Sequence, residues 1–378
     1  MNTQWATEHF SLELHRYPKG QHDKSLQAWD SADELLVDYV LTSVSPATPL
    51  CVFNDNFGAI ALGLDGFPLT SVSDSKIAHL AVLENAERNQ LSGPEFLNSL
   101  APLPDFDVAL IKLSKNLAML EYQLHQLVSH RPNATIVAAG KTTQVTSGVL
   151  KLFERFYSDV TTSLAKKKSR LIFASAAKSK FPEIAPLKGF HWPQHDLQLD
   201  AYANVFSREQ LDIGGRFLAE NLPSDLTAKK VIDLGCGNGL LGVATVKETA
   251  NAPAHVTFVD ESFMAVESAR YNVEQNRPEA LNHCEFIQND CLSGFKSNSV
   301  DTILCNPPFH QQNAITEHIA LQMFKDAKRV LADGGDLYVV ANRHLPYQEP
   351  LKKHFGGFKV FAQNAKFIIY HSLKRSNP

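Results

Sequence analysis

Long apolar runs, paired cysteines and a strong net charge are all missing from this sequence of 378 residues. No apolar run approaches the ~18 residues that a membrane-spanning helix needs, and the first residues lack the basic-then-apolar pattern of a signal peptide. The five cysteines include no Cys-x-x-Cys pair, which argues against a disulfide framework and against a zinc site. We therefore expect a cytoplasmic protein without a bound metal, in a reducing compartment.

The net charge is slightly negative, but positive charge is concentrated in one segment. The net charge is −4, from 36 Lys and Arg against 40 Asp and Glu, so bulk charge does not indicate a nucleic-acid partner. Between Lys151 and Lys188, however, nine Lys or Arg face only three Asp or Glu. The densest part of this segment consists of Lys166, Lys167, Lys168 and Arg170. Such a cluster can contact RNA phosphates or can be a solvated basic surface, and both interpretations stay open.

The second half of the sequence alternates short apolar strands with amphipathic helices. Helices are expected over 264–276 and 317–331, and the strand-like runs lie at 231–234, 255–259, 284–287, 302–305 and 336–340. Alternation of this kind builds a parallel sheet with helices on both faces. The length also exceeds one comfortable core, because domains hold ~100–200 residues. The sequence therefore predicts an α/β protein of two domains.

The first half repeats this plan, with strand-like runs at 50–53, 69–74, 106–111 and 135–139. Four residues of the first half have a counterpart of the same type in the second: Gly58 and Gly239, Asp74 and Asp260, Asn89 and Asn276, Asp107 and Asp301. The pattern indicates an internal duplication, with two unrelated α/β domains as the alternative. We expect domains at 1–185 and 186–378, joined by the Pro-, His- and Lys-rich segment 174–201.

One glycine-rich loop, at residues 231–239, reads Val-Ile-Asp-Leu-Gly-Cys-Gly-Asn-Gly. Glycines after a buried strand let the backbone approach a ligand closely. Dinucleotide sites use a Gly-x-Gly-x-x-Gly spacing, and a pyrophosphate does not favour a nearby carboxylate. S-adenosylmethionine has a cationic amino acid end and fits this loop better, with a dinucleotide as the alternative. The cofactor-binding residues expected from this loop are Asp233, Gly235, Gly237, Asn238 and Gly239.

Two further acids follow later strands. Asp260 closes the second strand and can accept hydrogen bonds from both ribose hydroxyls, or it can be an ordinary surface residue of a turn. Asp290 follows the third strand and can accept from the adenine amino group, although Asn289 competes for that role. We expect both aspartates to bind the cofactor.

The sequence Asn306-Pro307-Pro308-Phe309 ends the fourth strand. An amino group on an aromatic ring is a poor nucleophile because its lone pair is delocalised. The side-chain oxygen of Asn306 and the carbonyl of Pro307 can accept its two N–H bonds, and the prolines preset both acceptors. Phe309 offers a face for stacking a base. Double proline can also be a plain rigid turn, but its place beside the glycine loop favours amine methylation at Asn306, Pro307 and Phe309.

The first half lacks both chemical motifs. Its loop reads Asn-Asp-Asn-Phe-Gly at residues 54–58, and Lys112 begins the segment that corresponds to Asn306. We therefore expect domain 1–185 to be a degenerate, non-catalytic copy that binds RNA or supports the second domain. Amine methylation needs no cysteine nucleophile, so Cys291 and Cys305 are expected to pack in the core.

The chain resembles the bacterial ribosomal RNA guanine-N2 methyltransferases of the RsmC and RlmG type, most closely the large-subunit (23S rRNA) member. The resemblance covers essentially the whole chain, and the segments that carry it are 26–30, 203–208, 211–216, 259–262, 304–312 and 340–347. It implies tandem Rossmann-like (class I) S-adenosylmethionine-dependent methyltransferase folds, the second catalytic, with N2-methylguanosine as product. It also implies that the segment containing Phe206 closes the cofactor pocket. His310 and Arg343 are further candidates for RNA contact.

Several alternatives stay open at this point. The small-subunit (16S) relative shares the motifs of the catalytic half, so the choice of 23S rRNA depends on overall similarity. A protein glutamine methyltransferase uses a related Asn-Pro-Pro loop but commonly ends it in Tyr after a small helical domain. A non-catalytic rRNA-binding assembly factor would have no need of Asp233 and Asn306. We expect a monomeric two-domain enzyme without a metal or a membrane partner.

Overall fold

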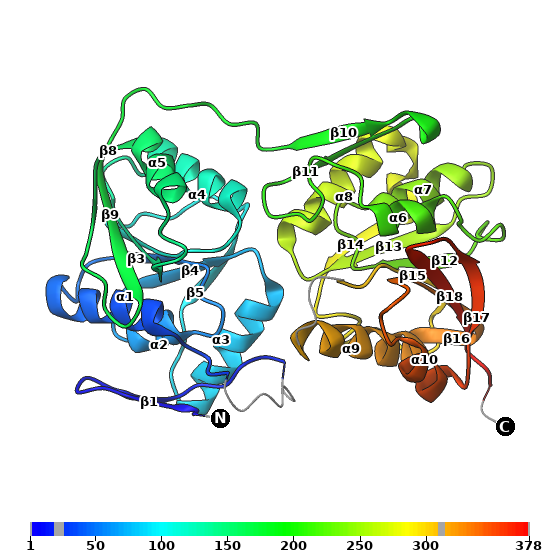
Figure 1. Cartoon of the computed structure of the whole chain (residues 1–378), viewed down its shortest axis with the longest axis horizontal. Helices are drawn as coiled ribbons and strands as arrows, with labels where there is room; N and C mark the ends of the chain where they lie inside the picture. Colours follow the sequence, from blue (N-terminus) through cyan, green and yellow to red (C-terminus); the bar gives the residue numbers. More distant parts are fainter. Residues whose placement is uncertain (1, 19–25, 309–313, 377–378) are drawn as a thin grey trace. The chain divides into compact units, whose positions relative to one another are not determined.

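The computed structural model describes residues 2–18, 26–308 and 314–376 (Figure 1). The chain forms two compact units, residues 1–186 and 187–378. Each unit contains one seven-stranded sheet and one separate two-stranded hairpin. The α/β class and the tandem duplicated arrangement expected from the sequence are thereby confirmed.

The first unit has a short hairpin before its sheet. The helices and strands of this unit are β1 (Gln4–Ala6), β2 (Ser11–Glu13), α1 (Ser31–Ser43), β3 (Leu50–Phe53), α2 (Ala59–Gly63), β4 (Leu69–Ser73), α3 (Lys76–Arg88), β5 (Glu95–Asn98), β6 (Val108–Lys112), α4 (Leu117–His130), β7 (Thr135–Lys141), α5 (Ser147–Phe156), β8 (Tyr157–Thr162) and β9 (Ser169–Ala177). The strand order of its sheet is β5-β4-β3-β6-β7-β9-β8, with β9 antiparallel to β7 and the first five strands parallel.

The second unit has the same order of elements. They are β10 (Lys188–Trp192), η1 (Pro193–His195), β11 (Leu197–Ala201), α6 (Ile213–Ala219), β12 (Lys230–Leu234), α7 (Leu240–Glu248), β13 (His255–Asp260), α8 (Phe263–Asn276), η2 (Pro278–His283), β14 (Cys284–Gln288), β15 (Val300–Cys305), α9 (Ala314–Val330), β16 (Leu331–Asn342), α10 (Gln348–Phe355), β17 (Lys359–Gln363) and β18 (Phe367–Leu373). Its sheet runs β14-β13-β12-β15-β16-β18-β17, again with an antiparallel strand after five parallel ones. The two sheets therefore have one topology.

The central strands form because helices cover both faces of each sheet. All four residues of β3 are buried, and so are the last four residues of β12. Such continuous apolar runs are typical of parallel strands, whereas half-exposed strands alternate. The helices that follow the second strand of each sheet begin at equivalent serines, since Ser75 and Ser262 accept from backbone N–H groups of α3 and α8. Local sequence and packing thus agree in both copies.

Paired asparagines tie each hairpin to the middle of its unit. In the second unit, Asn272 and Asn276 on α8 each clamp one residue of β11 through both its N–H and its C=O group. Asn85 on α3 and Asn89, the residue directly after α3, clamp the segment that contains β2 in the same way. The predicted correspondence of Asn89 with Asn276 has this contact as its physical basis, and it extends the duplication to the hairpins.

The expected linker at 174–201 is largely structured. Its first residues complete β9, and its last residues form the hairpin of β10 and β11, whose five paired residues run antiparallel. The boundary between the two units, between residues 186 and 187, lies within this segment, and the asparagine clamps of α8 make its last residues part of the second unit. None of the described helices is long and apolar enough to cross a lipid bilayer. The described residues also contain no cluster of metal-ligating side chains.

Candidate active site

The glycine loop and the Asn306 loop leave the second sheet side by side. Leu234, the last residue of β12, pairs with Cys305, the last residue of β15. The two strands are parallel, so both loops lie at the carboxyl edge of the sheet, where open α/β sheets bind ligands. A β-carbon added at Gly235 would lie 3.7 Å from the carbonyl oxygen of Asn306. The two motifs thus form one continuous site.

The glycine loop has a backbone that only glycine adopts readily. Gly235, Gly237 and Gly239 have φ angles of +74°, +54° and +83°. A β-carbon at Gly239 would lie 2.8 Å from that of Ala269, so this glycine permits close packing of α8. At Gly237 a β-carbon would meet no described atom within 4 Å, so this part of the loop faces open space. The loop can therefore admit a ligand next to Gly237.

Asp233 is almost completely buried at the carboxyl end of β12, with 1% of its surface exposed. Its Oδ2 accepts a hydrogen bond of 2.8 Å from the backbone N–H of Gly242 in α7. Burial, together with the charge of Asp260, raises the pKa of Asp233 to about 8, although the bond from Gly242 opposes the rise. A buried carboxyl group of this kind gains stability from a cationic partner, as the cofactor's ammonium group would be.

The two later aspartates lie next to the glycine loop. Asp260 accepts hydrogen bonds of 3.0 Å from the N–H groups of Gly237 and Ser262, which fixes its carboxylate beside the loop. The backbone of Asn289 binds the carbonyl of Asp260, which brings the Asp290 turn to the same edge. The side-chain amide of Asn289 donates to carbonyls within that turn. This observation favours Asp290 over Asn289 as the residue that faces a ligand.

Asn306 is held in one orientation by a residue that the sequence reasoning did not single out. Its Nδ2 donates a hydrogen bond of 2.9 Å to Oδ2 of Asp212. Its Oδ1 is buried and has no hydrogen-bond partner among the described residues. A buried acceptor without a partner is costly, by about 1–3 kcal/mol. The side chain thus keeps an acceptor oxygen that no described residue uses.

Asp212 also caps helix α6, because the same Oδ2 accepts a bond of 2.6 Å from the N–H of Gly215. Gly215 leaves room for these contacts, since a β-carbon there would lie 3.0 Å from Asp212 Oδ2 and 3.3 Å from Asn306 Nδ2. An aspartate before a short helix is an ordinary capping signal. Nothing in the sequence pattern alone indicated that this cap reaches across to Asn306, 94 residues away.

The other predicted site residues have different surroundings. Pro307 is buried directly after Asn306, and Phe206 is 51% exposed. Phe309 and His310 lie outside the described residues. Arg343 is exposed and donates to the carbonyl of Asn364.

Of the two thiols considered near the site, Cys305 lies in the core and Cys291 is half-buried against it. Cys305 is completely buried on β15, and burial raises the pKa of both Cys305 and Cys291 well above the usual range of a thiol. Neither group is available as a thiolate nucleophile at neutral pH. This finding agrees with the core packing expected for both cysteines.

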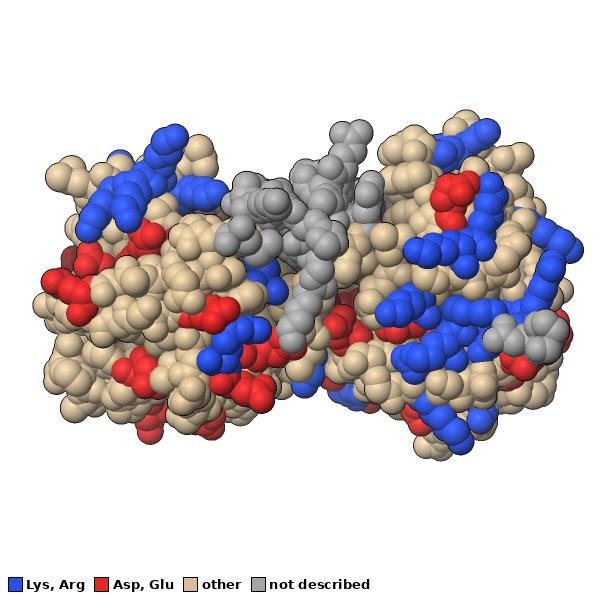
Figure 2. Space-filling model, turned by 90° about the horizontal axis from the view of Figure 1, so that it is seen from below, with Lys and Arg blue, Asp and Glu red and all other residues tan. Residues whose placement is uncertain are grey.

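The basic cluster of the first unit is partly neutralised. Lys166 lies 3.1 Å from Asp38, and Lys167 lies 2.6 Å from Glu34, so two of its cations have carboxylate partners on α1. Lys168 is exposed, and Nε of Arg170 is buried without a partner among the described residues. On the face drawn in Figure 2, Lys and Arg gather at the upper left of this unit, and Asp and Glu lie mainly below them. The role of the cluster in RNA binding stays a prediction.

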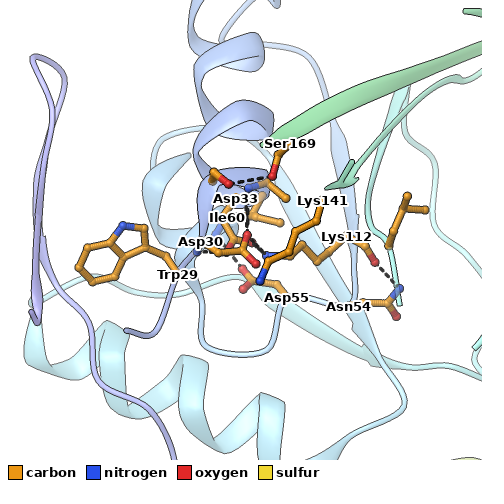
Figure 3. A network of polar contacts seen from close by, with 12 residues as sticks. Trp29, Asp30, Asp33, Asn54, Asp55, Ile60, Lys112, Lys141 and Ser169 are labelled. Atoms are coloured by element: carbon orange, nitrogen blue, oxygen red, sulfur yellow. Dashed lines mark hydrogen bonds and ion pairs between the residues drawn. The ribbon is translucent and has the colours of Figure 1, made fainter. Parts of the chain in front are cut away.

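The corresponding edge of the first unit is filled by its own side chains (Figure 3). Strand register places Lys112 where the second unit has Asn306, and Lys112 forms ion pairs of 2.7 Å with Asp30 and 2.5 Å with Asp33. Burial opposes the charge of Lys112, but the two aspartates outweigh it and raise the pKa of Lys112. The lysine therefore stays charged, and its network occupies the edge.

The loop of the first unit is closed in the same manner. Asp55 accepts three hydrogen bonds, from the N–H groups of Gly58, Ile60 and Ala61. Asn54 has the position of Gly235, and its side chain donates 3.0 Å to the carbonyl of Lys112. The space next to a glycine in one unit is thus taken by an asparagine side chain in the other.

Comparison with known proteins decides the family. Residues 2–178 match the RLMG N-terminal domain, and residues 196–371 match the methyltransferase small domain. Ribosomal RNA large subunit methyltransferase G of Pseudoalteromonas translucida is 45% identical, over 100% of this chain and 99% of its own. The chain belongs to the ribosomal RNA large subunit methyltransferase G family. Two further members also match. The Aeromonas hydrophila member is 46% identical, over 99% of this chain and 100% of its own. The Yersinia pestis member is 42% identical, over 97% of this chain and 93% of its own.

The fold of the large subunit methyltransferase G family also has a solved counterpart. The T. thermophilus 16S rRNA N2 methyltransferase RsmC, in complex with AdoMet and guanosine, superimposes with a TM-score of 0.76. It covers 99% of this chain and 98% of its own at 20% identity, so it shows the shared fold. The family resemblance inferred from the sequence motifs is confirmed. Membership in a methyltransferase family also decides against the dinucleotide-binding and non-catalytic alternatives.

Proposed function

We propose that this enzyme transfers a methyl group from S-adenosylmethionine to the exocyclic 2-amino group of a guanine in the large-subunit (23S) ribosomal RNA. The observation that carries the proposal is the amide of Asn306, which is fixed by Asp212 and presents a buried Oδ1 without a described partner. The names of relatives that are 42–46% identical support large-subunit rRNA as the substrate.

The residues around the glycine loop suit S-adenosylmethionine. Gly237 faces open space, and the buried carboxyl group of Asp233 lies at the start of the loop. We assign Asp233 to the ammonium group, Asp260 to the ribose hydroxyls and Asp290 to the adenine amino group. Gly235, Gly237, Asn238 and Gly239 shape the loop, and Phe206 covers the pocket. The cofactor supplies an electrophilic methyl group, which bonds to N2 of guanine as its carbon–sulfur bond breaks.

The chain acts on the amino group by positioning it. Asn306 Oδ1 and the Pro307 carbonyl each accept one N–H bond, which localises the nitrogen lone pair and directs it at the methyl carbon. After transfer, N2 releases one proton to solvent. Phe309 is the proposed stacking surface for the base. In this proposal the second unit performs the chemistry and the first unit is non-catalytic. One chain supplies all of these residues, so the enzyme acts as a monomer. It acts in the cytoplasm, where its rRNA substrate is found.

The test is methylation of purified rRNA in vitro. Large-subunit and small-subunit rRNA from a strain that lacks the gene are incubated with S-adenosylmethionine, and nucleosides are identified by mass spectrometry. We expect N2-methylguanosine in the large-subunit RNA only. N306A should lower the single-turnover rate by about 10²–10³ and leave cofactor affinity unchanged. Methylation of small-subunit RNA, or of another nucleoside, would overturn the assignment.

A further inference from the structure

A basic groove lies between α9 and α10 in the second unit, away from the residues described above. It has a volume of about 570 Å³, and His318, Lys325, Lys353 and His354 are among its lining residues. Figure 2 shows Lys and Arg gathered over this side of the second unit. The groove therefore has the charge and the size expected of a surface that contacts a polyanion.

The cations of this groove have few carboxylate partners. Glu349, the acid among its lining residues, already pairs with Lys352 at 2.8 Å. Lys325 and Lys353 form no ion pair within the described part of the chain. Burial and the charges of these two lysines together lower the pKa of His354. Positive charge is thus left uncompensated here, whereas Lys166 and Lys167 of the first unit are paired.

The topology connects the groove to the candidate active site. Helix α9 follows the Asn306 loop directly in sequence, and α10 follows β16, which is parallel to β15. Both helices therefore start from the sheet edge at which Asn306 lies and run back from it. A strand of RNA lying in the groove can continue to that edge and deliver a base there.

We propose that the α9–α10 groove binds the phosphate backbone of the RNA substrate, next to the nucleotide that is methylated. This inference rests on the proposed function. Each phosphate neutralised by a lysine releases counterions, so the logarithm of the binding constant falls with the logarithm of salt concentration by about 0.7 per contact for single strands. The groove supplies two such contacts through Lys325 and Lys353.

The experiment compares K325Q/K353Q with the matched pair K166Q/K167Q in the full chain. Binding of a large-subunit rRNA fragment is measured by fluorescence anisotropy across a range of salt concentrations. K325Q/K353Q should flatten the log–log slope by about 1.4, from two contacts, with cofactor affinity unchanged. K166Q/K167Q should flatten the slope less, because both lysines already have carboxylate partners. A wild-type slope in K325Q/K353Q, or a loss confined to K166Q/K167Q, would overturn the proposal.

Failure of the groove and failure of the proposed function give different results. If the groove does not bind RNA but the proposed activity is correct, K325Q/K353Q makes N2-methylguanosine and its RNA binding has the wild-type dependence on salt. If the function is wrong, the wild-type enzyme makes no N2-methylguanosine in this RNA, whatever the slope of either variant.

A second inference comes from the contact between Asp212 and Asn306. An asparagine amide can present its oxygen or its nitrogen to a ligand, and the two orientations differ by a flip. The carboxylate of Asp212 accepts only, so it selects the orientation in which Nδ2 faces Asp212 and Oδ1 is left as the acceptor without a described partner. We infer that Asp212 is a positioning residue for Asn306, in addition to its role as the cap of α6.

Two variants separate these roles. D212S keeps a good capping residue, whose short side chain does not reach Asn306, whereas D212N keeps an acceptor oxygen at the original reach. D212S should lower the single-turnover rate by about 10- to 100-fold, as loss of a hydrogen bond to a charged group predicts, with cofactor affinity unchanged. D212N should restore most of the rate. Equal rates in D212S and D212N, or a parallel loss of cofactor affinity, would reduce Asp212 to a structural cap.

Discussion

The two units have the same scaffold but treat the carboxyl edge of the sheet in opposite ways. Both have one strand order, asparagine clamps on the third helix and an aspartate that caps the helix before the sheet. In the first unit, that aspartate is Asp30, and it pairs with Lys112. In the second unit it is Asp212, which binds Asn306. In both units the capping aspartate therefore contacts the corresponding residue at the sheet edge, which is a lysine in the first unit and an asparagine in the second.

The difference shows what an open site requires of its scaffold. The first unit satisfies the polar groups at this edge of its sheet internally, because Asp55 accepts three backbone N–H groups and Lys112 binds two carboxylates. The second unit keeps an acceptor on Asn306 without a described partner and a buried carboxyl group on Asp233. Buried polar groups without a partner lower the stability of the folded unit, and a ligand that binds to them offsets this cost. At this edge of the sheet, the first unit therefore needs no ligand to complete its polar contacts, whereas the second unit does.

The largest expected effect comes from removing the cation of the first unit. K112M leaves Asp33 buried without its partner, and breaking a buried ion pair costs about 3–5 kcal/mol. Burial already raises the pKa of Asp33 to about 7, so in the variant a folded carboxyl group binds its proton more tightly than an unfolded one. The loss should therefore be smallest at low pH and grow as the pH rises through 7.

Hydrogen exchange of peptides from each unit measures this effect in the full chain. Protection should fall in residues 31–141 and stay unchanged in residues 230–373. K112M/D33N, which removes the charge and keeps an acceptor for the capping contact with Asp30, should recover much of the protection. Equal protection in K112M and wild type would show that the network contributes little to the first unit.

Transferring the lysine to the second unit tests the comparison from the other side. N306K should pair with Asp212 as Lys112 pairs with Asp30, so the fold is retained. The variant lacks the Asn306 acceptor and keeps only the Pro307 carbonyl, so it should lose about 10²–10³ in single-turnover rate. Methyl transfer is measured with saturating RNA, and circular dichroism checks the fold. Activity above a tenth of the wild type would mean that Asn306 does not act as an acceptor.

The smallest effect concerns the proton of Asp233. With a pKa of about 8, its carboxyl group is largely protonated at pH 7, and an ammonium partner favours the ionised form. Cofactor binding should therefore release close to one proton at pH 7, and affinity should rise as the pH increases from 6 towards 8. Calorimetry in two buffers of different ionisation enthalpy counts the proton. D233N cannot titrate and should release none; release by both proteins would point to another group.

The fold and the two site loops could be predicted from the sequence because their signals are local. Leu50–Phe53 is a strand over the range expected, and Asn306 lies at the end of β15 beside the glycine loop as its motif indicated. The hairpin of β10 and β11 was missed because its register depends on Asn272 and Asn276, more than 70 residues away. Contacts of that range leave no periodic pattern in the sequence.

The basic surface could not be predicted for a similar reason. Lys166, Lys167 and Lys168 are consecutive and attract notice, yet two of them are paired with α1 in the structure. Lys325 and Lys353 stand on different helices and come together only when α9 packs against α10. A run of like residues is visible in sequence, whereas a patch assembled from two elements requires the tertiary structure. The contact of Asp212 with Asn306 also requires the tertiary structure, because the sequence indicates only that Asp212 caps a helix.

The asparagine clamps also bear on how such a protein arose and how it can be divided. Asn272 and Asn276 bind β11, so a fragment that begins after residue 201 would lose the partners of both amides. The ancestral module that was copied therefore included the hairpin and its helix, not the sheet alone. A useful cut for separating the halves lies near Leu187, before β10, and recombination of halves between relatives should respect the same boundary.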